Sequence, residues 1–252
     1  MKSEGATFLL AVQFLTRLPV PTANIYTPRR MAASVRYYPL VGVLIGALCA
    51  ASFFLSDLVF PTAISVLIAI AFGLLITGGF HEDGLADTFD GIGGGLSRDK
   101  ALEIMRDSRL GTYGTLALII ALGLKALALS ALTPALILTG LILAHGVSRL
   151  SSVLVIATSA YVRAEGTGKP VSQGVSTLDI IVACLPVCLV FAAASTVLAP
   201  IALVWGIGGA VVGHVLMRLF FERKLGGYTG DTLGAVQQAS EVGVYLGLLA
   251  WL

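Results

Sequence analysis

Long apolar runs, each bounded by charged residues, proline or glycine, are the main pattern along this chain. A helix needs about 20 apolar residues to cross the roughly 30 Å hydrocarbon core of a bilayer. Seven runs approach this length, and the last is the weakest; they cover residues 40–58, 62–79, 113–132, 134–158, 178–198, 201–221 and 236–252. No ten-residue segments of alternating polarity, typical of barrel strands, occur. The pattern therefore predicts an all-α polytopic membrane bundle with about six or seven transmembrane helices.

The composition agrees with a membrane protein. Of the 252 residues, 57% are hydrophobic and 12% are charged, whereas soluble domains carry about 25% charged residues. The formal net charge is only +2, and there is no basic tract, so the lipid bilayer is an expected partner and nucleic acid is not. We interpret residues 1–252 as a single integral-membrane domain.

Basic residues mark alternate connections between the apolar runs. All but two of the 16 lysines and arginines lie in residues 1–38, 80–111, 159–177 and 218–232. The intervening turns contain none. Because lysine and arginine accumulate on the cytoplasmic side of short loops, we expect the N-terminus and these charged loops to be cytoplasmic in a multi-pass protein of the cell inner membrane.

The other two basic residues lie inside apolar runs, where a lone cation is costly. We expect a structural role for Lys125. For Arg149, one helical turn after His145, two interpretations remain open: its side chain snorkels to the membrane surface, or it faces an internal site.

An acidic stretch, HEDGLADTFDG, follows the second apolar run. On a helix, Asp83, Asp87 and Asp90 lie on one narrow stripe. Such a stretch is often a solvated helix end, but no lysine or arginine lies among residues 82–95 to pair with it. A hard divalent cation relieves the repulsion, and Mg²⁺ commonly binds one or two carboxylates together with substrate phosphates. We therefore predict a metal or metal-phosphate site at the mouth of the bundle.

The next stretch, SRDKALEIMRDSRLGTYG, predicts a helix that Ser97 caps and Gly111 ends. A helix lying on the membrane surface explains its pattern without any site. Its last turn nevertheless offers Arg106 and Arg109, which are suited to bidentate phosphate contact, beside Asp107 as a possible metal ligand.

A second glycine-rich stretch, KLGGYTGDTLGA, contains Asp231 and is by itself equally consistent with a simple loop. Together, however, these stretches resemble the cobalamin 5'-phosphate synthase family (adenosylcobinamide-GDP ribazoletransferases). The resemblance depends on FLTRLPVP (14–21), RYYPLVGVLIG (36–46), GGFHEDGLADTFDG (78–91), MRDSRLGTYG (105–114) and KLGGYTGDTLGA (224–235). These motifs occur in the family's order and extend over essentially the whole chain.

The resemblance implies a Mg²⁺-dependent membrane enzyme of late cobalamin synthesis. It would join adenosylcobinamide-GDP to α-ribazole or its 5'-phosphate, release GMP, and form adenosylcobalamin or its phosphate. Phosphoryl transfer of this kind depends mainly on neutralising and orienting charged oxygens.

We assign site residues on this basis. The predicted metal ligands are Asp83, Asp87 and Asp90, with Glu82 as a further ligand or supporting partner. The residues expected to contact metal or a substrate hydroxyl are Asp107 and Asp231, and those expected to hold the diphosphate are Arg106 and Arg109. His81 is a candidate general base, although a single histidine at a helix end more commonly packs or caps.

Two other classes remain as alternatives. Alcohol phosphotransferases of phospholipid synthesis also present aspartate-rich helices, but their pattern has arginine where this chain has Asp87. A divalent-cation transporter would place its acids near mid-membrane on broken helices, and this cluster follows the end of a run.

Overall fold

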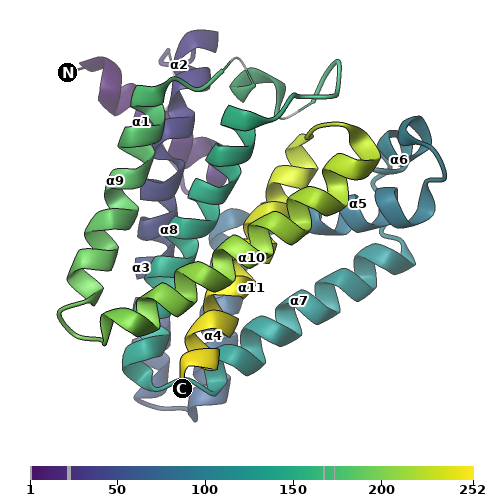
Figure 1. Ribbon diagram of the computed structural model, residues 1–252. Helices are drawn as coiled ribbons and strands as arrows, with labels where there is room; N and C mark the ends of the chain where they lie inside the picture. Colours follow the sequence, from purple (N-terminus) through teal and green to yellow (C-terminus); the bar gives the residue numbers. More distant parts are fainter. Residues whose placement is uncertain (1, 22–23, 167, 173) are drawn as a thin grey trace.

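The computed structural model describes residues 2–21, 24–166, 168–172 and 174–252, which form a helical bundle with no extended strand (Figure 1). Its α-helices are α1 (Lys2–Leu15), α2 (Pro28–Ala33), α3 (Tyr38–Asp57), α4 (Thr62–Thr77), α5 (Phe80–Gly94), α6 (Arg98–Ile104), α7 (Thr112–Ser130), α8 (Pro134–Thr158), α9 (Thr177–Ala194), α10 (Pro200–Leu225) and α11 (Gly230–Trp251). The 3₁₀ segments are η1 (Ser34–Tyr37) and η2 (Lys169–Val171). The predicted all-α class is confirmed.

Several helices are long and apolar enough to cross a membrane. In the described ranges there are five, namely Pro28–Asp57, which includes α3, and α7, α8, α9 and α10. The helices α4 and α5 are long and apolar enough only when they are taken together, and the pair is bent by 87°. Counted as one broken span, this pair brings the number of candidate spans in the described ranges to six. The polytopic bundle is therefore confirmed, with five or six spans.

The bend between α4 and α5 lies at two glycines. Gly78 and Gly79 have φ angles of 67° and 66°, in the left-handed region that glycine adopts without steric cost. A Cβ on Gly78 would also lie 2.5 Å from Nε of Arg17. The chain therefore leaves the direction of α4 here, and the acidic stretch on α5 runs across the bundle.

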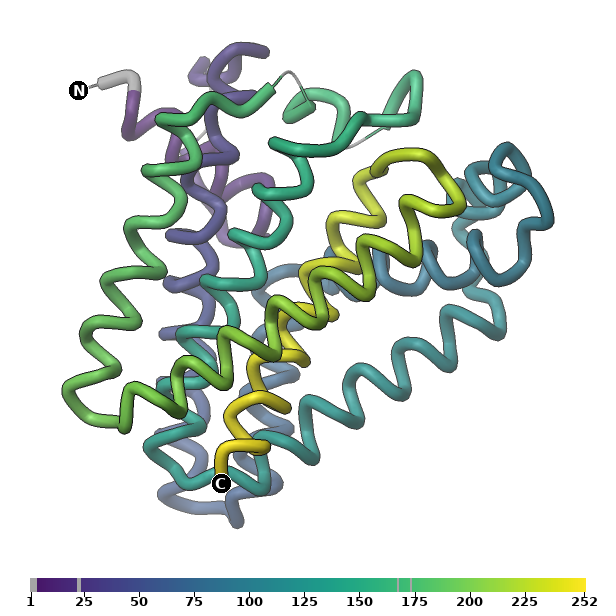
Figure 2. The backbone as a smooth tube through the Cα atoms, viewed as in Figure 1, coloured from purple at the N-terminus to yellow at the C-terminus, as the bar shows by residue number. Residues whose placement is uncertain are grey.

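The connections between the helices lie at two opposite ends of the bundle (Figure 2). In this view the hairpins α3–α4, α7–α8 and α9–α10 lie at the lower end with the C-terminus. The N-terminal segment, α6 and the loops after α8 and α10 lie toward the upper end. The basic connections thus share one end of the molecule, as their alternation in the sequence indicated.

The last predicted span, residues 236–252, forms most of helix α11. This helix is not among those that are long and apolar enough to count as a candidate span. It packs against α5, α7, α8 and α10. Gln237, Gln238 and Glu241 are 0%, 1% and 3% exposed. Gln237 Nε2 donates to Ser148 Oγ of α8 and Gln238 Nε2 donates to Glu82 Oε1 of α5, so α11 is held by polar partners on its neighbours as well as by apolar packing.

Glycines allow α10 and α11 to approach closely. A Cβ on Gly209 would lie 2.0 Å from the carbonyl oxygen of Gly243, and a Cβ on Gly213 would lie 2.2 Å from that of Ala239. Gly209 and Gly213 are four residues apart, the spacing that lets membrane helices pack backbone to backbone.

This contact gives a matched pair of variants on one helix. Gly209→Ala is expected to lower the free energy of unfolding by about 1–3 kcal/mol, because the new methyl group overpacks a backbone contact. Gly208→Ala is expected to change it little, since a Cβ there meets nothing within 4 Å. Thermal denaturation in detergent checks both, and equal midpoints would contradict the packing argument.

The helix predicted from Ser97 to Gly111 is shorter than expected. The hydroxyl of Ser97 accepts a hydrogen bond from Lys100 N, as predicted for a cap, but α6 ends at Ile104. The carboxylate of Asp107 accepts a hydrogen bond from Arg109 N, at 3.1 Å. This local bond stabilises a turn and competes with helix, so Gly111 caps the start of α7 instead.

Candidate active site

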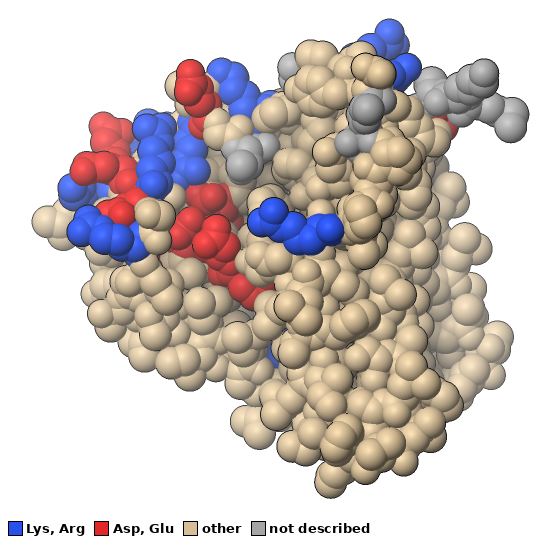
Figure 3. Space-filling model, turned by 180° about the vertical axis from the view of Figure 1, so that it is seen from behind, with Lys and Arg blue, Asp and Glu red and all other residues tan. Residues whose placement is uncertain are grey.

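The acidic side chains of α5 line a hollow at the loop end of the bundle. Asp83 is exposed and Asp87 is half-buried, and their spacing places them on one side of the helix. Figure 3 shows acidic side chains on the floor of this hollow and basic side chains around it. The sequence prediction of a carboxylate stripe near the mouth of the bundle agrees with this arrangement.

The start of α11 brings a third carboxylate to the stripe. A Cβ on Gly84 of α5 would lie 2.6 Å from the carbonyl oxygen of Asp231, and a Cβ on Gly234 would lie 2.9 Å from that of His81. Glycine at both positions thus permits the two backbones to touch. Asp231, in the first turn of α11 and more than a hundred residues from α5 in the chain, is thereby placed beside Asp87.

The carboxylates of this site disfavour one another's charge. Burial, followed by the charges of Asp231 and Asp83, raises the pKa of Asp87 to about 7. Burial also raises the pKa of Asp231, although the guanidinium of Arg163 acts in the opposite direction. Ionising all three in this protein is costly without an added positive charge.

Asp90, the third residue of the predicted stripe, already has partners. Its Oδ2 accepts a hydrogen bond from Gly111 N at 2.7 Å and its Oδ1 accepts one from Gly114 N at 2.8 Å. A Cβ on either glycine would lie 2.4 Å from this carboxylate. Asp90 therefore binds backbone N–H groups at the start of α7, and its role as a metal ligand stays a prediction.

Glu82 and His81 contact the inside of the bundle. Oε1 of Glu82 accepts a hydrogen bond from Gln238 Nε2 at 2.8 Å and lies 3.7 Å from Lys125 Nζ. His81 is 4% exposed, and its ring packs edge-on against Phe80. The metal role of Glu82 and the base role of His81 stay predictions.

Behind Glu82 lies a buried ionic network that the sequence pattern did not predict. Glu241 Oε1 lies 2.8 Å from Lys125 Nζ and its Oε2 lies 3.4 Å from Arg149 Nη1. The same Arg149 nitrogen is 2.7 Å from His145 Nδ1. Lys125 and Arg149 are 3% and 2% exposed, so neither snorkels. The signal in the sequence was the presence of ionisable residues within apolar runs.

The predicted diphosphate-binding residues, Arg106 and Arg109, do not lie in one site. Arg109 is exposed, and its Nη2 lies 2.6 Å from Oδ2 of Asp107. Arg106 instead lines a cavity together with Arg163, whose position in the sequence predicted only the orientation of its loop. Nη2 of Arg163 lies 2.7 Å from Oδ2 of Asp231. Only folding brings this arginine to the carboxylate site.

The donor set fits Mg²⁺ in type and charge. Among the described residues, no group of three or more histidine, cysteine, aspartate or glutamate side chains is arranged to hold a metal ion by itself. Mg²⁺ commonly takes one or two carboxylates and completes its shell with phosphate oxygens and water. The raised pKa of Asp87 is the observation that favours a cation there.

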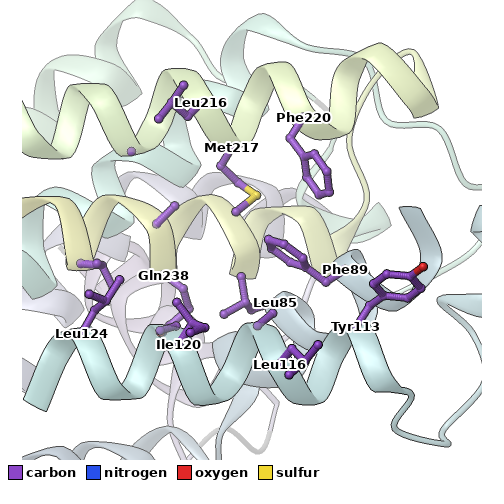
Figure 4. Close-up of a pocket in the computed structure, with 15 residues that line it drawn as sticks. Leu85, Phe89, Tyr113, Leu116, Ile120, Leu124, Leu216, Met217, Phe220 and Gln238 are labelled. Carbon is purple, nitrogen blue, oxygen red and sulfur yellow. The ribbon is translucent and has the colours of Figure 1, made fainter. Parts of the chain in front are cut away.

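A larger cavity, of about 550 Å³, lies away from these carboxylates. Figure 4 shows it between α7 and α10, with Leu85 and Phe89 from the opposite side of α5. Its lining is apolar apart from Tyr113 and Gln238. Because α7 and α10 are both candidate spans, this groove lies at the depth of the apolar helices and contributes no charged group to the site.

The fold and site define a class: a polytopic, all-helical membrane protein with a carboxylate site in a basic-rimmed hollow at one end. Residues 7–249 match the family described as cobalamin-5-phosphate synthase. The chain therefore belongs to the cobalamin-5-phosphate synthase family.

Relatives named adenosylcobinamide-GDP ribazoletransferase match almost the whole chain. The protein of Leptothrix cholodnii is 43% identical, covering 98% of this chain and 96% of the relative. That of Shewanella amazonensis is 42% identical over the same shares, and that of Shewanella woodyi is 40% identical, covering 100% and 98%. No solved structure matches. These matches do not favour a phospholipid alcohol phosphotransferase or a cation transporter.

Proposed function

We propose that this chain is an adenosylcobinamide-GDP ribazoletransferase. In the proposed reaction, a hydroxyl of α-ribazole or α-ribazole 5'-phosphate attacks the diphosphate phosphorus that carries the cobinamide. A P–O bond forms, the diphosphate bridge breaks, GMP leaves, and the hydroxyl loses its proton. The observation that supports this reaction is the convergence of Asp83, Asp87 and Asp231 beside a buried arginine.

In this proposal Asp83 and Asp87 hold Mg²⁺, with Asp231 as the next ligand. When bound, Mg²⁺ supplies positive charge that stabilises the phosphate oxygens during transfer. We assign positioning roles to Asp90, which binds the start of α7, and to Glu82, which binds Gln238 of α11. We assign a packing role to His81, since its ring is buried.

We also propose that the basic end of the bundle faces the cytoplasm at the inner membrane. The support is the collection of the basic connections at one end, as the preference of lysine and arginine for cytoplasmic loops requires. Labelling of single cysteines in intact cells tests it. A cysteine in the α7–α8 hairpin should react with an impermeant reagent and one in the loop after α8 should not; the reverse pattern would reject the orientation.

The activity is tested directly with the purified full chain in detergent. Incubation with Mg²⁺, adenosylcobinamide-GDP and α-ribazole should release GMP and form a corrinoid product in equal amounts. No GMP release under conditions in which the protein is folded would reject the proposed function. Omitting α-ribazole is the control, because hydrolysis alone would release GMP without the corrinoid product.

The binding of Mg²⁺ is expected to weaken as the pH falls. Because the pKa of Asp87 is about 7 in the folded protein, protons compete with the cation below that pH. The apparent dissociation constant for Mg²⁺ should rise about tenfold from pH 8 to pH 6 for one competing proton. Calorimetric titration measures it, and Asp87→Asn should remove this dependence. A constant affinity in the unmodified protein would contradict the assignment.

A further inference from the structure

A second cavity, of about 460 Å³, adjoins the carboxylate site at the loop end. Its lining residues are Arg106, Arg163, Ala164, Glu165 and Gly166. Arg106 follows α6, whereas the others belong to the loop after α8. We call this the arginine cavity. Its wall is shared with the carboxylate site, because Nη2 of Arg163 lies 2.7 Å from Oδ2 of Asp231.

Arg163 has hydrogen-bonding capacity that the described residues leave unused. Its side chain is 7% exposed. Nη2 forms the ion pair with Asp231, and Nε has no hydrogen-bond partner among the described residues. Buried N–H groups without acceptors are unfavourable. The guanidinium groups of Arg106 and Arg163 line the cavity, and guanidinium groups suit phosphate because they donate in a bidentate manner.

The loop that carries Arg163 is held in place by backbone contacts with the GGYTG segment. Val162 N donates to Tyr228 O at 3.0 Å, and Tyr228 N donates to Ala160 O at 2.9 Å. A Cβ on Gly227 would lie 2.2 Å from Ala160 O, so only glycine permits this approach. The fold therefore positions the guanidinium before any ligand arrives.

Tyr161 adds an unused polar group to the same segment. Its hydroxyl is buried and has no hydrogen-bond partner among the residues that the structure describes. A Cβ on Gly166, which lines the cavity, would lie 2.7 Å from this hydroxyl oxygen. The Tyr161 hydroxyl thus lies behind the wall of the cavity, and the cavity itself is lined by two guanidinium groups and the carboxylate of Glu165.

We propose that the arginine cavity binds the phosphate of a nucleoside monophosphate group, with Arg163 and Arg106 as its donors. This inference rests on the proposed function, in which that group is the GMP portion of the substrate and then the leaving product. Asp231 contacts Arg163 on one side, and the nucleotide phosphate occupies the other. The cavity thereby places the leaving group next to the carboxylates that hold Mg²⁺ in the proposed reaction.

The test is the affinity of the detergent-solubilised full chain for GMP, measured by calorimetry with Mg²⁺ present. Arg163→Ala and Arg106→Ala are each expected to weaken GMP binding at least tenfold. Arg163→Lys, which keeps a cation beside Asp231 but loses the bidentate geometry, should give an intermediate affinity. Arg223→Ala removes an exposed arginine at the same end and should bind GMP like the unmodified protein.

The outcomes separate this inference from the proposed function. Unchanged GMP affinity in both alanine variants, or no GMP binding by the unmodified protein, would overturn the cavity assignment even if the enzyme turns over. Conversely, GMP binding that depends on Arg163, together with no ribazole transfer, would reject the proposed reaction and keep the cavity. If Arg163→Ala fails to fold, Arg106→Ala decides, because Arg106 makes no described side-chain hydrogen bond or ion pair.

Discussion

Asp87→Asn is expected to reduce the rate of GMP release at saturating Mg²⁺ by about a thousandfold, equivalent to about 4 kcal/mol of transition-state stabilisation. Asparagine keeps the shape of the side chain but removes the charge at the centre of the proposed metal site. Steady-state release of GMP from adenosylcobinamide-GDP measures the effect. Turnover within tenfold of the unmodified enzyme would contradict the assignment.

The thermal stability of this variant distinguishes a functional role from a structural one. Folding raises the pKa of Asp87 to about 7, so the folded protein is more stable when this carboxyl is protonated. That contribution to the free energy of unfolding is lost as the pH rises through about 7. At pH 8 without Mg²⁺, Asp87→Asn should therefore unfold at the same or a higher temperature. The matched control is Asp99→Asn on α6, whose side chain is 92% exposed; both its turnover and its stability should be unchanged.

Lys125→Met is expected to lower the free energy of unfolding by about 3–5 kcal/mol, since breaking a buried ion pair leaves a buried charge uncompensated. Its ammonium lies 2.8 Å from Glu241 and 3.7 Å from Glu82, so both carboxylates lose their partner on α7. Thermal denaturation in detergent measures the change. Lys100→Met is the control, because Lys100 is exposed on α6.

A double variant tests whether the charges themselves carry the effect. Lys125→Met combined with Glu82→Gln removes one charge of each sign, keeps the pair of Arg149 and Glu241, and should recover much of the stability lost in the single variant. A Lys125→Met protein that unfolds at the same temperature as the unmodified chain would show that the network does not contribute to stability. The network also connects to the site, because Glu82 precedes Asp83 on α5.

The local features of the fold follow from sequence periodicity and composition. Apolar runs of membrane-spanning length predicted the helices, and the alternation of basic connections predicted which of them share an end. The spacing of Asp83 and Asp87 predicted their common face, because helix geometry relates residues four positions apart wherever the helix lies. The motifs also sufficed to indicate the family.

The structure adds specific hydrogen bonds at two places where the sequence pattern gave only an average polarity. The helix predicted up to Gly111 ends at Ile104, since Asp107 stabilises a turn with Arg109. The last apolar run forms a helix that is less apolar than the other spans, and its polar residues Gln237 and Glu241 are hydrogen-bonded to each other inside the bundle. In both cases specific hydrogen bonds outweigh a pattern of average polarity.

By itself the sequence determined the helical membrane class, the carboxylate stripe of α5 and the end of the bundle at which it lies. Only the tertiary structure decided how Asp231, which the family resemblance had assigned to the site, reaches that stripe together with Arg163. It also decided that Asp90 binds the start of α7 and that Lys125 pairs with Glu241. The physical reason is that periodicity constrains neighbours along one helix. Contacts between residues distant in the chain depend instead on which helices pack together, and here they depend on glycines that allow two backbones to touch.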